Sequence, residues 1–287
     1  PETPIPGLFL TGQDAGFPGI VGATMAGWTS ACRILGPKGY LQINQSLSSA
    51  PESACETSDP EPTQDPSHSA PRLRAQVVHA DWLSPHIRNL VLKLPRSQEW
   101  TPGQYALIRV APFEWRPYSL ASASGETVRF LIDVRTKGKG AAFADSLEPG
   151  DKVELQLPLG NFEIHSEDAE NDEAPSRRRI FIATGSGIAP FCAAFEEGIR
   201  ADDLLLFGCA NTDEDLTLRL KTPIPPIIRC MTREASTAAF KGRVTDYLRT
   251  SGIDQSADYY VCGSPLMVAD VTRLIRDAGG HVHTESF

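Results

Sequence analysis

Short segments in which apolar and polar residues alternate fill residues 72–165. The strand candidates are LRAQVV, IRNLVLKL, QYALIRV, TVRFLIDVR and DKVELQLP. Alternation with a period of two is typical of strands that bury one face. Turn residues separate these segments, and long helical patterns are lacking. The pattern predicts an antiparallel β-barrel.

Residues 177–287 have a different rhythm. Apolar strands (RIFIAT, DLLLFGC, PIIRCM and DYYVCG) alternate there with helical stretches such as PFCAAFEEGIRA and PLMVADVTRLIRDAG. This β-α-β order predicts a doubly wound parallel sheet. The acidic run at 166–176, SEDAENDEAPS, lies between the two patterns and is typical of a solvated surface loop. The expected fold class is therefore β followed by α/β.

Two further pieces precede the barrel. Residues 1–43 include GLFLTGQDAGFPGIVGA at 7–23, which reads as a strand, a glycine-punctuated turn and the first turn of a helix. Nucleotide-binding loops are built in this way. Residues 44–71 are rich in Ser, Pro and acidic residues and contain no Lys or Arg. We expect a disordered linker there, because so few apolar groups cannot offset the entropy of the chain.

Composition excludes several classes of protein. The 287 residues are enough for about two domains. A formal net charge of −9 argues against a general nucleic-acid or anionic-membrane binder. No apolar run is long enough for a transmembrane segment, and no signal-peptide pattern is present. The 6 cysteines are scattered without zinc or iron–sulfur spacing, which predicts no metal site and free thiols in a reducing cytoplasm.

The barrel half holds a first candidate binding strand, EWRPYSLAS. Arg116 and Tyr118 share one face of such a strand, and Ser119 points to the other. Arginine suits a phosphate, tyrosine suits ring stacking, and a serine hydroxyl can donate a hydrogen bond to a heterocycle nitrogen. A plain surface strand is the alternative.

Two glycine-rich turns are further candidates. In TKGKGAAFADSL, Gly138 and Gly140 precede a helical stretch at Ala141–Leu147. In IFIATGSGIAPF, a buried strand runs into a glycine turn and then into a helix that begins near Pro190. Each arrangement lets backbone N–H groups approach a phosphate, although a simple turn into a helix also needs glycine.

Later strand ends should meet the same crevice, because ligands bind at the carboxyl ends of parallel strands. FGCA ends at residue 210, and Thr232 and Arg233 follow the strand that ends in CM. Arg243 comes ten residues after Arg233. Cys262 and Gly263 end the strand DYYVCG.

These motifs together resemble the ferredoxin–NADP(H) reductase superfamily. The matching features are RPYSLAS, GKGAAF, GDKVELQLPLGNF, ATGSGIAPF, FGCANTDEDL, YYVCGSPLM and the closing HTESF, in the family's order. The resemblance covers residues 72–287. It implies an FAD-binding barrel at 72–165 and an NAD(P)-binding domain at 177–287.

The resemblance also implies roles for individual residues. Arg116 would bind the flavin pyrophosphate, Tyr118 would pack on the isoalloxazine, and Ser119 would hydrogen-bond near N5. Catalytic positions would be Ser119, Cys262, Glu285 and Phe287, with Phe287 stacking on the flavin until nicotinamide displaces it. The cofactor-binding residues would be Arg116, Pro117, Tyr118, Ser119, Gly138, Lys139, Gly140, Ala141, Ala142, Thr184, Gly185, Ser186, Gly187, Ile188, Ala189, Pro190, Thr232, Arg233, Arg243, Cys262 and Gly263.

The choice of nucleotide can be argued from charge. A 2′-phosphate needs cations and hydroxyl donors, whereas a bare ribose is usually held by a carboxylate. Thr232, Arg233 and Arg243 favour NADPH over NADH. Glu234 is the contrary signal, because its carboxylate could accept from a ribose.

We therefore expect a flavoprotein reductase that moves a hydride from NADPH to FAD and then passes electrons to an acceptor. The acceptor is open: a fused flavoprotein domain, a ferredoxin or flavodoxin, or free flavin. An electron-transfer subunit without nicotinamide turnover is the alternative. Residues 1–36 resemble the C-terminal end of phytoene desaturase, carotenoid isomerase and retinol saturase flavoproteins, which suggests a fusion. An unrelated amphipathic helix is the other reading of residues 1–43.

Overall fold

The computed structural model describes residues 70–136, 138–164, 177–234 and 237–286. Several sequence-based expectations fall outside these residues. They are the motif within residues 1–43, the linker up to residue 69, the acidic run at 166–176 and Phe287. Residues 64–287 belong to one compact unit.

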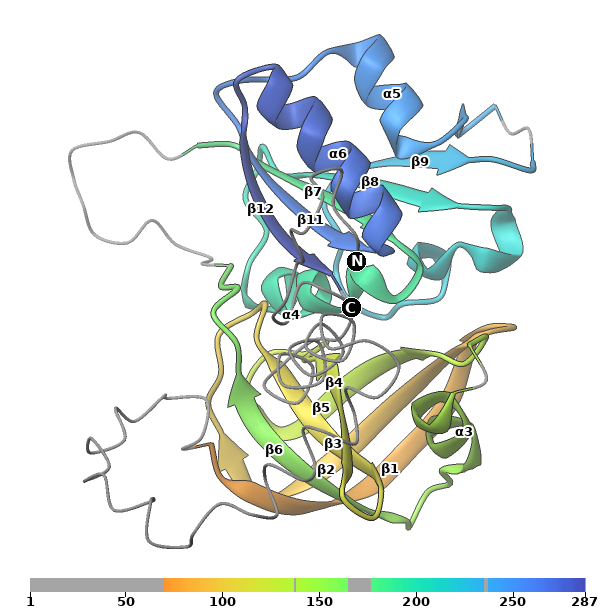
Figure 1. Cartoon of the computed structure of the whole chain (residues 1–287), viewed down its shortest axis with the longest axis vertical. Coiled ribbons are helices and arrows are strands. Elements are labelled where there is room, and N and C mark those ends of the chain that lie inside the picture. Colours follow the sequence, from red (N-terminus) through yellow and green to blue (C-terminus); the bar gives the residue numbers. More distant parts are fainter. Residues whose placement is uncertain (1–69, 137, 165–176, 235–236, 287) are drawn as a thin grey trace, which may run out of the picture. The chain divides into compact units, whose positions relative to one another are not determined.

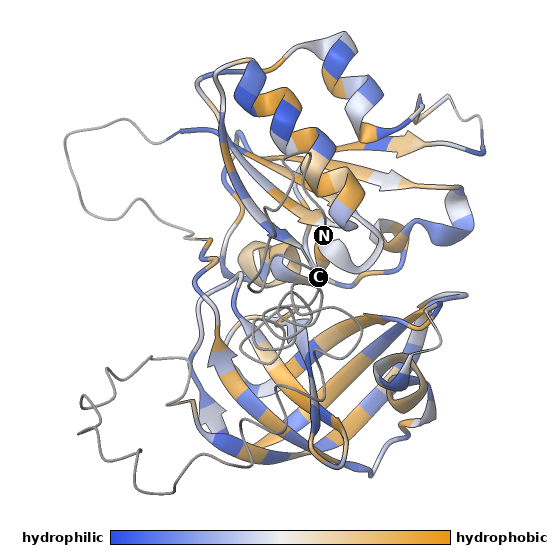
Figure 2. Ribbon diagram, viewed as in Figure 1, coloured by the Kyte–Doolittle hydropathy of each residue, from blue (hydrophilic) through white to orange (hydrophobic). Residues whose placement is uncertain are grey.

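The first half of this unit is a six-stranded antiparallel sheet, ordered β4-β3-β6-β1-β2-β5. The strands are β1 (Arg72–Ser84), β2 (Ile87–Gln98), β3 (Tyr105–Ala111), β4 (Glu114–Ser119), β5 (Gly125–Asp133) and β6 (Lys152–Leu159). Apolar and polar residues alternate along them (Figure 2). The apolar set, including Leu92, Val128, Phe130 and Leu155, forms one buried cluster.

A single short helix, α3 (Lys139–Ser146), follows β5. It begins two residues earlier than the stretch expected from the sequence, which started at Ala141. Ala144 and Leu147 bury their side chains in the barrel core. The buried guanidinium of Arg88 donates to the carbonyl oxygens of Ala144 (3.4 Å) and Leu147 (2.6 Å). A cation at the carbonyl end of a helix satisfies acceptors that lack a partner within the helix.

The second half is a six-stranded sheet ordered β10-β9-β8-β7-β11-β12, in which every paired strand is parallel. The strands are β7 (Arg179–Thr184), β8 (Leu204–Cys209), β9 (Ile227–Met231), β10 (Phe240–Lys241), β11 (Asp258–Gly263) and β12 (His281–Ser286). The outer strand β12 is not among the strands expected from the sequence. Its residues HVHTES are mostly polar, as suits the edge of a sheet.

Helices cover both faces of this sheet. Figure 1 shows α5 (Val244–Ser251) and α6 (Pro265–Asp277) on one side and α4 (Ala189–Glu197) on the other. Successive β7 residues therefore alternate between two cores. Ile180 and Ile182 pack with the α5 and α6 side, while Phe181 and Ala183 pack with α4.

The α4 side of the parallel sheet shares its core with the barrel. Leu83, Ile87, Ala121 and Leu131 come from the barrel half and belong to the same buried cluster as Phe181. One continuous apolar cluster thus joins the two halves and fixes the edge along which their loops meet. Within the part of the chain that the structure describes, no helix combines the length and apolar character needed to cross a membrane.

Candidate functional site

A cleft of about 720 Å³ opens along this edge. One wall comes from the barrel strands β4 and β5, including Tyr118, Ser119 and Asp133. The other wall comes from the carboxyl ends of β7, β8, β9 and β11 and from the start of α6. This is the edge at which open α/β sheets bind their ligands.

On the barrel wall, β4 and the start of α3 lie against each other. A Cβ atom on Gly140 would collide with the Tyr118 hydroxyl and approach the Arg116 side chain to 3.4 Å. Only glycine allows this contact, which brings together two of the predicted flavin-binding segments. Glu114 connects them as well, through contacts to Arg116 (2.5 Å) and Lys139 (2.6 Å). The Lys139 contact, followed by the Arg116 charge, lowers the pKa of Glu114.

On the opposite wall, two glycine loops interlock. Thr184 ends β7, and the 3₁₀ turn Gly185–Ile188 follows it, with Gly185 at φ +55°. A Cβ atom on Gly187 would collide with the backbone of Cys262 and Gly263. Gly263 has φ +150°, and its own Cβ would collide with the Thr184 hydroxyl. Only glycine at both positions allows the two loops to pack this closely, and an α-helix, α4, begins directly after Ile188.

Glu285 lies close both to Ser119 of the barrel wall and to Cys262 of the opposite wall. The Ser119 side chain, 7% exposed, hydrogen-bonds the Glu285 carboxyl group. Glu285 lies on β12 opposite Cys262 of β11 in the parallel register. Burial raises the pKa of Glu285 to about 8, against the opposing effect of the Ser119 hydrogen bond. Burial also raises the pKa of the Cys262 thiol, and the Glu285 charge adds to that shift.

This group is thus uncharged near pH 7 and incompletely satisfied. Among the residues that the structure describes, the buried Oε2 atom of Glu285 has no hydrogen-bond partner. A buried polar atom left unpaired costs free energy, so a ligand that supplies a partner here gains affinity. The glycine loops and this orphaned oxygen fit a flat heterocycle with attached phosphates, as a flavin dinucleotide is.

The mouth of the cleft holds charged residues that the sequence analysis did not single out. Arg135 forms a bidentate pair with Asp133, with contacts of 2.5–3.1 Å, and lies 3.8 Å from the carboxylate of Glu214. The hydrogen bonds that Arg135 donates to the Asp133 carboxylate raise the pKa of Arg135. Asp270 of α6 also lines the cleft. Their signal in the sequence is charge directly after a strand or at the start of a helix.

The end of the cleft beyond β9 holds the residues expected to select the nucleotide. Thr232 and Arg243 line it, and the exposed Arg233 follows Thr232. Glu234, the contrary signal, accepts a hydrogen bond from the backbone N–H of Thr212 at 2.7 Å. That contact is also the main cause of the lowered pKa of Glu234. The Glu234 carboxylate is therefore engaged in holding a loop.

Most of the site residues predicted from the sequence line the cleft. Those that line it are Pro117, Tyr118, Ser119, Thr184, Gly185, Ser186, Gly187, Ala189, Thr232, Arg243, Cys262 and Gly263. Arg116, Gly138, Ile188, Pro190 and Arg233 do not line it but belong to strands, loops or helices that do. The remaining described residues lie on α3 and β12, which contribute no lining residue: Lys139, Gly140, Ala141, Ala142 and Glu285. Phe287 lies outside the described residues.

Comparisons with known proteins agree with this architecture. Residues 74–164 match the oxidoreductase FAD-binding domain, and residues 181–273 match the oxidoreductase NAD-binding domain. A solved ferredoxin NADP+ reductase from Neisseria gonorrhoeae, with bound FAD and NADP, is 19% identical with a TM-score of 0.64. It covers 75% of this chain and 98% of its own, and the likeness shows a shared fold.

Two curated relatives are reductases of oxygenase systems. The ferredoxin–NAD(P)+ reductase component of a Ralstonia sp naphthalene 1,2-dioxygenase/salicylate 5-hydroxylase system is 26% identical, over 92% of this chain and 88% of its own length. The reductase component 2 of a Comamonas sp terephthalate 1,2-dioxygenase is 28% identical over 72% of this chain. This chain spans only 65% of that relative's length.

The chain therefore carries an oxidoreductase FAD-binding domain and an oxidoreductase NAD-binding domain. It is an oxidoreductase that uses FAD and a nicotinamide nucleotide. This finding supports the resemblance to the ferredoxin–NADP(H) reductase superfamily.

Proposed function

We propose that this chain is an NADPH-dependent flavoprotein reductase that delivers electrons to a separate acceptor centre. The observation that carries the proposal is a single cleft with two different walls. Tyr118 and Ser119 of the barrel face the loops Gly185–Gly187 and Cys262–Gly263 of the parallel sheet. Two cofactors held on such walls would meet with their reactive rings in contact, which is what direct transfer between them requires.

The barrel wall is the proposed site of FAD. Arg116 would pair with the pyrophosphate, Tyr118 would pack against the ring system, and the backbone N–H groups of residues 138–142 would approach the phosphates. The close packing of Gly140 on Tyr118 supports this assignment. When bound, FAD accepts a hydride from the nicotinamide nucleotide and releases the two electrons to an acceptor.

Ser119 and Glu285 are the proposed proton-handling pair. With a pKa of about 8, Glu285 holds a proton at neutral pH, and the Ser119 hydroxyl hydrogen-bonds it. The Ser119 hydroxyl is then placed to donate toward a ring nitrogen, while Glu285 replaces or removes the proton that it shares. Cys262 would contact the nicotinamide ring, where its neutral thiol excludes water without adding charge.

The proposed preference for NADPH rests on the end of the cleft beyond β9. Thr232, Arg233 and Arg243 offer one hydroxyl and two guanidinium groups to a 2′-phosphate. Glu234, which follows Arg233 and could hold an unphosphorylated ribose, is instead engaged with the Thr212 N–H. Both observations favour NADPH over NADH.

The proposed boundaries are 72–165 for the FAD-binding barrel and 177–287 for the NAD(P)-binding domain. The acceptor is an iron–sulfur protein, a flavodoxin, free flavin or a fused flavoprotein domain. The resemblance of residues 1–36 to desaturase- and saturase-like flavoproteins motivates the fused acceptor. In that case a flexible connection at 44–71 would keep the acceptor at high effective concentration. A cytoplasmic location stays a prediction from the scattered cysteines.

An anaerobic titration of the full chain tests the proposal. The purified protein is reconstituted with FAD and titrated first with NADPH and, in a separate sample, with NADH, while the flavin absorbance is followed. We expect stoichiometric bleaching by NADPH and a higher kcat/KM for NADPH than for NADH. A protein that binds FAD but is bleached by neither nucleotide would instead be an electron-transfer subunit without nicotinamide turnover.

The fused acceptor needs its own experiment. The chain is compared with a longer protein that contains the residues preceding Pro1, with NADPH as the electron source and a polyene as the substrate. If the two domains work together, the longer protein reduces the polyene faster than an equimolar mixture of the separated parts. Equal rates would rule out a functional tether and leave a diffusible acceptor.

A further inference from the structure

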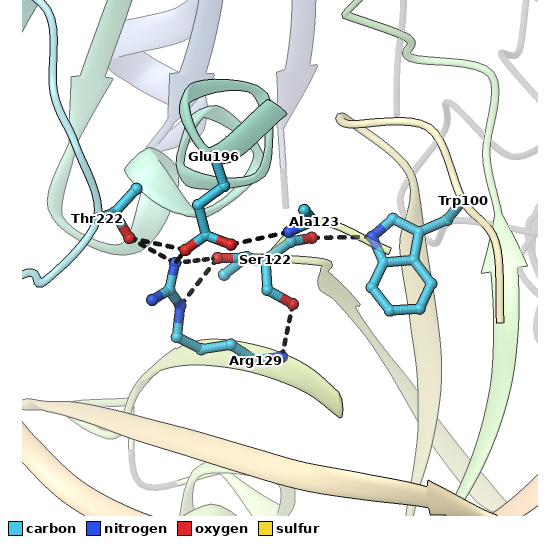
Figure 3. Close-up of polar contacts among 7 residues, drawn as sticks. Trp100, Ser122, Ala123, Arg129, Glu196 and Thr222 are labelled. Atoms are coloured by element: carbon cyan, nitrogen blue, oxygen red, sulfur yellow. Dashed lines mark hydrogen bonds and ion pairs between the residues drawn. The ribbon is translucent and has the colours of Figure 1, made fainter. Parts of the chain in front are cut away.

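A polar cluster connects the two halves of the protein at the end of α4 that lies away from the glycine loop. The Nη2 atom of Arg129, on β5, donates to Glu196 Oε1 at 2.6 Å and to Thr222 Oγ1 at 2.6 Å. The Nε atom of Arg129 donates to the carbonyl oxygen of Ala121 at 2.8 Å. Figure 3 shows these contacts converging between the barrel and α4. We call Arg129, Glu196 and Thr222 the Arg129 clamp.

Every polar atom that Glu196 presents to this clamp is used. Its Oε2 atom accepts from the Ala123 N–H at 2.9 Å, and Oε1 accepts from the Thr222 hydroxyl at 3.1 Å. The Arg129 and Glu196 side chains are 14% and 26% exposed. Charge-assisted hydrogen bonds that are largely shielded from water constrain geometry far more than an exposed ion pair does.

The backbone segment that contains Ala123, whose N–H donates to Glu196, is also hydrogen-bonded to the barrel. The carbonyl oxygen of Ser122 accepts from the indole Nε1–H of the buried Trp100 at 2.9 Å. The Ser122 hydroxyl accepts from the Arg129 N–H at 3.2 Å. Residues 121–123 directly follow Ser119 and Leu120. The backbone of this segment therefore connects the position of Ser119 to the clamp.

The other end of the connection is the nucleotide loop. Helix α4 has 9 residues and begins at Ala189, which lines the cleft directly after the turn Gly185–Ile188. A helix of this length is a stiff rod of roughly 12 Å. The clamp contacts the C-terminal end of α4, and the turn Gly185–Ile188 joins its N-terminal end.

We propose that Arg129 and Glu196 are positioning residues that set the separation between the flavin-contacting Ser119 and the nicotinamide loop. This inference rests on the proposed function. Neither side chain lines the cleft, so their effect passes through α4 and through residues 121–123. A misplacement of about 1 Å between reacting groups can lower a rate by up to about 100-fold. Loss of the clamp therefore slows hydride transfer more than it weakens the binding of either cofactor.

The halves stay in contact without the clamp, because the shared apolar cluster around Ala121, Leu131 and Phe181 remains. A clamp variant should thus fold and bind FAD. Glu196→Gln keeps the shape of the side chain and removes its charge. Glu126→Gln is the matched control, because Glu126 is an exposed carboxylate on the same strand as Arg129.

The test is anaerobic stopped-flow reduction of the FAD-loaded full chain by NADPH. For Glu196→Gln we expect the limiting reduction rate to fall about 10-fold, with FAD content and the apparent Kd for NADPH changed less than about twofold. Titration with NADP+ should also give a weaker long-wavelength absorbance from nicotinamide stacked on flavin. Glu126→Gln should match the wild type, and Arg129→Lys should retain more activity than Arg129→Ala.

The outcomes separate the clamp from the proposed function. A wild-type protein that NADPH does not reduce overturns the proposed function and this inference with it. A reducible wild type with an equally fast Glu196→Gln overturns the clamp alone. If Glu196→Gln fails to hold FAD, Thr222→Val is the second variant, because it removes one hydroxyl and keeps the ion pair. An unchanged limiting rate in Thr222→Val would then contradict the clamp.

Discussion

Glu285 carries a carboxyl group whose surroundings disfavour its charged form. Burial raises its pKa from 4.5 to about 8, and its Oε2 atom has no partner among the described residues. Below pH 4.5 the carboxyl is protonated in both the folded and the unfolded chain, so it makes no pH-dependent contribution to stability. Between pH 4.5 and 8 only the unfolded chain loses this proton, and the folded state is increasingly penalised as the pH rises. Above pH 8 the penalty is constant.

Glu285→Gln should therefore stabilise the FAD-free protein in a pH-dependent way. We expect a gain in the free energy of unfolding of at least about 1 kcal/mol at pH 8 and a much smaller gain at pH 4.5. Urea unfolding of both proteins across this pH range measures the difference. Glu126→Gln, at an exposed site on β5, is the control and should show no such trend. A gain independent of pH would mean that Glu285 is ionised in the folded state.

Helix α3 and strand β4 pack closely together because Gly140 has no side chain. Gly140→Ala would put a methyl group into the Tyr118 hydroxyl, forcing apart the two segments proposed to hold FAD. Gly138→Ala is a closely matched control, because its Cβ would meet only Thr136 Oγ1, at 3.9 Å. Gly140→Ala should weaken FAD binding about tenfold or more, measured by titration of flavin fluorescence, while Gly138→Ala changes it little. Equal affinities would place the flavin away from the α3–β4 contact.

The loop after β9 and the start of α5 converge at the end of the cleft. Arg243 precedes α5, where its backbone N–H donates to Asp246 at 2.9 Å, and it lines the cleft together with Thr232. If Arg243 binds a 2′-phosphate, Arg243→Ala should lower kcat/KM for NADPH about tenfold or more and leave that for NADH nearly unchanged. Arg249→Ala, on the exposed side of α5, is the control. A parallel loss with both nucleotides would assign Arg243 to a shared part of the dinucleotide.

Patterning predicts the elements of this fold better than it predicts their edges. Period-two alternation is strong in β1, β2, β3 and β6. The apolar runs of β7, β8 and β11 are equally plain. Strand β12 escapes such reasoning, because HVHTES has little apolar character and pairs only along one side, with β11. The start of α3 at Lys139 is likewise set by packing against Tyr118 rather than by local composition.

The candidate site likewise contains residues that sequence patterns reveal and contacts that they do not. Glycine turns and strand-end residues such as Cys262 can be found from sequence, because their chemistry is local. The ion pair of Arg135 with Glu214, and the clamp between Arg129 and Glu196, join residues far apart in the chain. No periodicity encodes those contacts. They depend on how two sheets pack.

At the scale of the whole molecule, the core shared by the barrel and the parallel sheet couples the stabilities of the two halves. The cluster that contains Phe181 of the parallel sheet also contains Leu83, Leu131 and Ile164 from the barrel and the segment after it. Ile164 is fully buried and its backbone N–H donates to the carbonyl oxygen of Pro102 at 2.8 Å. Each half also has a cluster of its own, but the cluster on the α4 side of the parallel sheet is completed only by residues of the barrel half.

We therefore expect the two halves to unfold in one cooperative transition. Ile164→Ala removes atoms from the shared core, and Leu94→Ala removes atoms from the barrel-only core. Each should cost about 2–4 kcal/mol of unfolding free energy. Of the 4 tryptophans, Trp82, Trp100 and Trp115 lie in the barrel. In a Trp28→Phe background, tryptophan fluorescence therefore follows the barrel, while far-UV circular dichroism follows mainly α4, α5 and α6. With a shared core, both substitutions shift both urea midpoints together. If Leu94→Ala shifts only the fluorescence midpoint, the halves are independent domains, and a clamp between them would then have to act across a mobile interface.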